Sequence, residues 1–131
     1  MTPELLVQFN AWVDRLLLEF GSTPVVAYNF NLYEHEAEFA MQLVGTNSFH
    51  LTDEDWACDE TFSSGEDLFY LPHTVFGDQW QTGLETANSL VKNYLQHGKH
   101  AALMKSTRGV GVGFVNGNID LVYRKRIARA K

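Results

Sequence analysis

The sequence predicts a single α+β domain in which an antiparallel sheet packs against two main helices. Segments 2–21 and 78–98 have apolar residues at helical spacing. Segments 26–43 and 109–124 instead have the patterning of paired strands. The order helix, hairpin, irregular acidic segment, helix and hairpin is typical of an α+β fold.

Size and composition agree with one domain that spans residues 1–131. Hydrophobic residues make up 45% of the chain and charged residues 20%, which are ordinary values for a globular protein. The single cysteine, Cys58, excludes an intramolecular disulfide and a cysteine-based zinc site. No apolar run approaches the roughly 18 residues that a membrane span needs. We therefore expect a cytoplasmic protein with no membrane partner.

The first helix is expected to begin at Thr2, whose hydroxyl can cap it, and to end at Gly21. Trp12 lies on the apolar face of this helix and is expected in the core. A hairpin follows, with a turn near residues 34–37. The segment SFHL, residues 48–51, is compatible with one more short strand.

The second helix is expected to have Asp78 as its N-cap and to stop at Gly98. The segment AALMKST, residues 101–107, is predicted to be a strand. A second hairpin is expected at Asn116–Gly117, because Asn-Gly between apolar runs is a strong hairpin signal. The terminal RKRIARAK, residues 124–131, is expected to fray or to form a short helical tail.

Motifs that would indicate catalysis or a cofactor are weak. The glycines of GVGVGFVNG lack the Gly-Lys-Ser/Thr ending of a phosphate loop, so we interpret them as allowing a close backbone approach or a bulge. An EF-hand starting at Asp53 fails at its sixth and twelfth positions. A metal site joining His50 or His73 to Asp53, Asp55 or Asp59 remains an alternative, as does general acid–base catalysis by paired carboxylates. We therefore expect no catalytic residue, no metal and no cofactor.

Charge is distributed unevenly along the chain, whose net charge is −6. No lysine or arginine occurs between Arg15 and Lys92, although thirteen acidic residues lie there. From Lys92 onward the sign of the charge reverses, because this stretch contains nine basic residues and a single acidic residue, Asp120. An acidic surface repels nucleic acid and anionic membranes and attracts basic proteins. A basic protein is therefore the expected partner, and nucleic acid is not expected.

The acidic segment TDEDWACDETFSSGEDLFY, residues 52–70, is the strongest candidate for a binding surface. It places seven carboxylates around one tryptophan with no basic residue among them. Aromatic anchors supply contact energy at interfaces, and carboxylates steer association and fix the register. The alternative is that the acids only solubilise a loop whose aromatic side chains turn inward. The predicted partner-binding residues are Asp53, Glu54, Asp55, Trp56, Asp59, Glu60, Glu66 and Asp67.

The size, charge and layout of the chain are similar to those of a known class of proteins. Three segments contribute most to this similarity: DEDWACDE, SSGEDLFYLPH and GVGFVNGNIDLVYR. With them the chain resembles the small cytoplasmic immunity proteins of bacterial polymorphic-toxin and contact-dependent inhibition systems. The resemblance implies steric and electrostatic occlusion of one cognate toxin, often a basic nuclease. The carboxylates would pair with the toxin's lysines and arginines, and Trp56 would pack as an anchor. Asp55→Ala or Trp56→Ala would then weaken partner binding with little loss of folding.

Two other functions remain open. A small enzyme or ligand-binding domain would use a pocket between the sheet and the helices. The basic C-terminal residues, which depart from a uniformly acidic inhibitor, would alternatively neutralise the phosphates of a nucleic acid.

Overall fold

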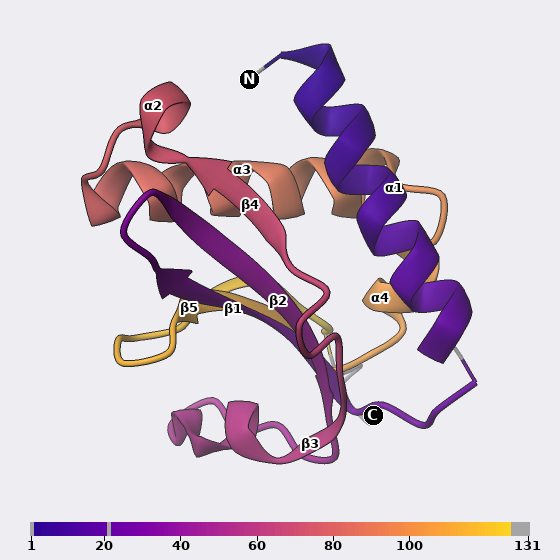
Figure 1. Cartoon of the computed structure of the whole chain (residues 1–131). Helices are drawn as coiled ribbons and strands as arrows, with labels where there is room; N and C mark the ends of the chain where they lie inside the picture. The colour runs from indigo at the N-terminus through magenta and orange to yellow at the C-terminus, as the bar shows by residue number, and fades with distance from the viewer. Residues whose placement is uncertain (1, 21, 127–131) are drawn as a thin grey trace, which may run out of the picture.

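A computed structural model describes residues 2–20 and 22–126 of the chain (Figure 1). Its helical elements are α1 (Pro3–Phe20), the 3-10 helix η1 (Glu54–Cys58), α2 (His73–Phe76), α3 (Trp80–His97) and α4 (Ala101–Lys105). Its strands are β1 (Ala27–Glu34), β2 (Glu38–Thr46), β3 (Glu60–Ser63), β4 (Phe69–Pro72), β5 (Gly109–Phe114) and β6 (Asp120–Arg124). The predicted α+β class is confirmed. None of the described helices is both long and apolar enough to cross a membrane.

The strands form one mixed sheet in the order β3-β2-β1-β5-β6, and β4 also pairs with β2. Both predicted hairpins are present, because β1 pairs antiparallel with β2 and β5 pairs antiparallel with β6. The expectation of a wholly antiparallel sheet is wrong, since β1 and β5 are parallel. Between β2 and β5 the chain passes through α3 and α4, and a helical crossover is the usual connection that brings two strands into parallel pairing.

Helices α1 and α3 cover one side of the sheet, which we call the helix face (Figure 1). Alternation along β1 sends Tyr28, Phe30 and Leu32 into the core beneath these helices. Trp12 of α1 is 6% exposed in the same core, as its helical spacing predicts. The other side, which we call the second face, is covered at one end by η1 (Figure 1).

Three predicted details differ from the structure. The segment AALMKST begins with helix α4 and holds no strand, because Ala, Leu, Met and Lys are strong helix formers. The segment SFHL is not a strand, although its Phe49 side chain is buried at 3% exposure. Helix α3 has Gln79 as its N-cap, and the Asp78 carboxylate accepts a hydrogen bond from the Gln79 side chain (3.3 Å) instead of capping the helix.

Two predicted chain features fall partly or wholly outside the described residues. Gly21, the expected end of the first helix, lies outside the described residues, and α1 extends to Phe20. The expected tail began at residue 124, but Arg124 is the last residue of β6. Residues 127–131 lie outside the described part of the chain.

The glycines of β5 lie where other groups approach the strand closely, which confirms their interpretation. A Cβ on Gly111 would collide with the side-chain oxygen of Asn29, and a Cβ on Gly113 would collide with the backbone oxygen of Asn118. The β5–β6 ladder also shifts register between Val110 and Gly111, the irregularity expected of a bulge. Glycine at these positions lets the β5–β6 loop and a side chain of β1 pack directly on the strand.

Replacing Gly113 by alanine should lower the free energy of unfolding by about 1–3 kcal/mol, because the added methyl group meets backbone atoms that cannot rotate away. Gly117→Ala is the matched control, since a Cβ there would lie 3.7 Å from its nearest neighbours in Phe114. Urea denaturation measures both changes. A Gly113→Ala protein as stable as the wild type would contradict the close approach.

Candidate functional site

Within the acidic segment, η1 packs on the second face and β3 pairs with β2 at the edge of the sheet. Asp53 caps η1, because its carboxylate accepts a hydrogen bond from the backbone N–H of Asp55 (3.0 Å). Trp56 lies in the middle of η1, and its ring centre is 5.0 Å from that of Phe49. These two rings form a small apolar cluster with Ala27 of β1. The cluster fastens η1 to the sheet.

The expected role of Trp56 as an exposed anchor for a partner does not agree with the structure. Its side chain is 3% exposed, so the indole has no free face to offer. The alternative interpretation, in which aromatic side chains of the acidic segment turn inward, is correct for Trp56 and for the buried Phe62. Removing a buried tryptophan side chain costs about 3–5 kcal/mol of stability, so Trp56→Ala would disturb folding and not binding alone.

Burial of Trp56 leaves the carboxylates around it at the surface. Five of the predicted residues are exposed on η1 and beside it, and we call them the acidic surface: Asp53, Glu54, Asp55, Asp59 and Glu60. Glu54 accepts a hydrogen bond from the backbone N–H of Ile119 (2.9 Å), which ties η1 to the β5–β6 loop. Within residues 2–20 and 22–126, the side chains of Asp55, Asp59 and Glu60 make neither an ion pair nor a hydrogen bond. These three carboxylates are therefore available to a partner.

The remaining two predicted residues lie apart from this surface. Asp67 accepts hydrogen bonds from both the Arg15 guanidinium (Nη2–Oδ1, 3.1 Å) and the Trp12 indole (3.2 Å). The Arg15 hydrogen bond holds the pKa of the Asp67 carboxyl below its usual value, with smaller help from Trp12. Asp67 therefore fastens the β3–β4 turn to α1. Glu66 is exposed beside it.

A row of polar side chains on the second face was missed as a functional feature, although the alternation of β1 predicts one wetter face. Asn29 donates to Asn31 (2.7 Å), Asn31 donates to the Gln42 side-chain oxygen (3.0 Å), and Tyr33 donates to the same oxygen (3.0 Å). We call these four residues the polar row. Burial, and then the negative charge of Glu60, raise the pKa of the Tyr33 hydroxyl. The polar row therefore lies within electrostatic reach of the acidic surface.

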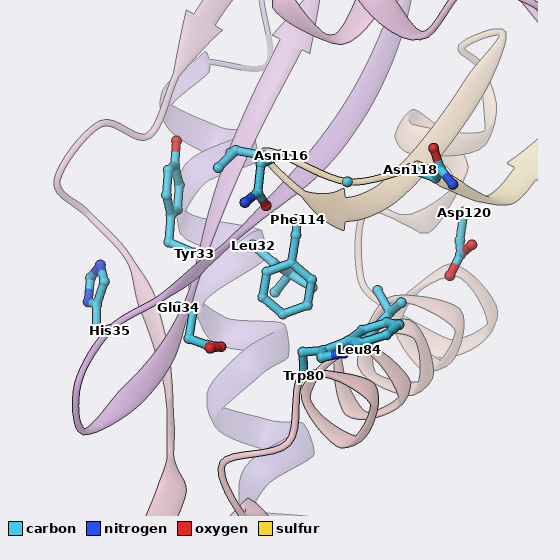
Figure 2. Close-up of a pocket in the computed structure, with 12 residues that line it drawn as sticks. Leu32, Tyr33, Glu34, His35, Trp80, Leu84, Phe114, Asn116, Asn118 and Asp120 are labelled. Atoms are coloured by element: carbon cyan, nitrogen blue, oxygen red, sulfur yellow. The ribbon is translucent and has the colours of Figure 1, made fainter.

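A cavity of about 790 Å³ lies at the carboxyl ends of the parallel strands β1 and β5, beside the start of α3 (Figure 2). Leu32, Leu84, Phe114 and the indole of Trp80 form its apolar walls. Its position agrees with the pocket between sheet and helices that was left open as an alternative. No motif in the sequence predicted which residues would line it, because it depends on the parallel pairing.

The histidine–aspartate metal site is not assembled in the described part of the chain. No three His, Cys, Asp or Glu side chains there lie close enough together to hold a metal ion. His73 instead packs against Phe39, with ring centres 4.6 Å apart.

Comparison with known proteins adds no family to this geometry. No protein-family model, curated protein or solved structure matches the chain. The functional argument therefore depends on the acidic surface, the polar row and the cavity.

The Asp67–Arg15 pair should contribute to stability only while Asp67 is ionised. Because its folded-state pKa is lowered, the contribution is present above the unfolded-state pKa of about 3.9 and is lost as the pH falls through the folded-state value. Asp67→Asn keeps the acceptor for Trp12 and should cost at most about 1 kcal/mol at pH 7, since both partners are partly exposed. Urea denaturation at pH 7 and near pH 2 should show this cost disappearing in acid. A cost that is the same at both pH values would contradict the ion pair, and Glu66→Gln serves as the neighbouring control.

Proposed function

We propose that this chain is a cytoplasmic binding protein that neutralises a basic protein partner through the acidic surface. In its most specific form, the proposal is an immunity protein that blocks a cognate toxin, as the resemblance implies. The observation that carries the proposal is a set of three exposed carboxylates on and beside η1, which have no partner among the described residues and whose position is set by the buried Trp56.

Rigid placement is what distinguishes this surface from a solvated acidic loop. A flexible loop would lose conformational entropy when it binds, whereas η1 is already packed against the sheet. Solvated surfaces normally mix charges of both signs. Arg108 approaches this region, but its guanidinium lies over the Phe49 ring at 5.6 Å and makes no ion pair among the described residues. The charge of the acidic surface is left for a cationic partner.

The polar row supplies the uncharged part of the proposed interface. Tyr33 and Tyr70 lie on strands that flank β2, each opposite Ala40, so both are placed on the second face. Tyr70 is 46% exposed, and tyrosine is enriched in protein interfaces because it offers an apolar ring and a hydrogen-bonding hydroxyl. A partner seated here would find amide groups and aromatic rings beside the carboxylates.

The test removes negative charge from the acidic surface while it keeps the fold intact. The triple variant Asp55→Asn/Asp59→Asn/Glu60→Gln deletes three carboxylates that make no bond in the described residues. The control Glu4→Gln/Glu19→Gln/Glu85→Gln deletes three exposed carboxylates elsewhere on the chain. Proteins captured from native cell extract at low salt are identified, and each is titrated against all three forms by calorimetry. We expect one basic partner whose Kd rises at least about tenfold for the triple variant and little for the control.

The salt dependence of the affinity and a cell-growth assay complete the test. Affinity for the wild type should fall as salt rises, because exposed charges are screened. The captured protein should be toxic when expressed alone and harmless when this chain is co-expressed. A partner that binds the triple variant and the wild type equally at every salt concentration would overturn the acidic surface, and a partner that is not toxic would overturn the immunity proposal alone.

A further inference from the structure

The cavity beside α3 has the composition of a binding site, and of the residues assigned to the proposed interface only Tyr33 also lines it. It is lined by the end of β1, the β5–β6 loop, the first residue of β6 and the beginning of α3. Its volume of about 790 Å³ falls within the range of about 300–1,000 Å³ typical of small-molecule pockets. We infer that it binds an organic cation: an amine or guanidinium group carried on an apolar stem.

The apolar walls provide contact area for the stem. Trp80 is 52% exposed, whereas the other two tryptophans, Trp12 and Trp56, are 6% and 3% exposed. Figure 2 shows the Trp80 indole along one wall, with the Phe114 ring facing the space above it. A ligand stem placed against these rings would cover an indole that the described part of the chain leaves half exposed. Such a contact also allows a cation to interact with the aromatic faces.

Two carboxylates give the cavity its charge preference. Glu34 and Asp120 lie on opposite sides of Phe114, and Figure 2 shows the Glu34 carboxylate turned toward the cavity. One oxygen of Asp120 accepts a hydrogen bond from Asn88 of α3 (3.0 Å), which orients the carboxylate. Among the described residues that line the cavity, none is a lysine or an arginine. The lining therefore carries two negative charges and no fixed positive charge.

Two groups oppose this preference, and both are weaker. The first residues of α3 bring the positive end of a helix dipole to the cavity, equivalent to roughly half a charge. His35 also lines the cavity, but its ring points away in Figure 2 and lies 4.0 Å from the Glu38 carboxylate. Two full carboxylate charges outweigh half a charge, so the cavity should select cations over anions.

A matched set of three compounds tests the charge preference directly. Phenylbutylamine, phenylbutanol and phenylbutyrate share one apolar stem and differ in a positive, neutral or negative end group. Trp80 should dominate the ligand-dependent change in fluorescence, because Trp12 and Trp56 are buried. We expect saturable binding of the amine with a Kd at least tenfold lower than that of the alcohol, and the weakest binding for the carboxylate.

Variants assign the effect to the cavity. Glu34→Gln and Asp120→Asn should each weaken amine binding several-fold, and Asp120→Asn keeps an acceptor for Asn88. Trp80→Phe keeps an aromatic ring but a smaller one, so it should weaken amine binding a few-fold in calorimetry while abolishing the fluorescence change. Glu66→Gln, an exposed carboxylate that does not line the cavity, should change neither.

A capped lysine, N-acetyl-lysine methylamide, distinguishes the source of the cation. Tighter binding of the capped lysine than of phenylbutylamine would assign the cavity to a basic side chain of a protein, and tighter binding of phenylbutylamine to a small molecule. Equal binding of amine and carboxylate, or no saturable binding of any cation at millimolar concentration, would overturn the inference. Either result would leave the acidic surface untouched, because none of its residues lines the cavity.

Discussion

The packing of the Trp56 indole against Phe49 and Ala27 is the contact on which the second face depends. Because the side chain points inward from η1, the backbone of the acidic segment is held against the sheet while its carboxylates project into solvent. Strand β5 passes beside this cluster, where a Cβ on Gly111 would make only an ordinary contact with the indole, at 3.5 Å. Burial of one apolar group thus determines where several charges are displayed. An acidic loop without this contact would present the same charges with no fixed geometry.

The sheet separates two surfaces with different chemistry. The helix face carries the core and, at the carboxyl ends of the parallel strands, the cavity with its exposed indole. The second face carries the acidic surface and the polar row, whose hydrogen bonds run from β1 to β2. The β5–β6 loop belongs to both, because it lines the cavity while the N–H of Ile119 is held by Glu54. This hydrogen bond, together with the packing of Ile119 against the Trp56 cluster, connects η1 to the loop.

Local patterns in the sequence predicted much of the fold, and long-range contacts set the rest. Helical spacing placed Trp12 in the core, alternation placed the first hairpin and the Asn116–Gly117 dipeptide placed the second, because each signal depends on neighbours in the chain. The parallel pairing of β1 with β5 has no local signal. The same holds for the candidate site. The density of acidic residues predicted the acidic surface on η1. The burial of Trp56 and the hydrogen bond from Arg15 to Asp67, 52 residues away, depend on tertiary packing. The residues that line the cavity could not be predicted, because the cavity depends on the same parallel pairing.

Amide hydrogen exchange tests most directly whether burial of Trp56 holds the acidic segment on the sheet. Three amides report on it: Asp59 donates to Trp56, Asn47 donates to Asp59, and Ile119 donates to Glu54. All three should exchange slowly in the wild type and faster together in Trp56→Ala, while amides in the β1–β2 ladder stay protected. Fast exchange of these amides in the wild type, as in a free loop, would contradict the account.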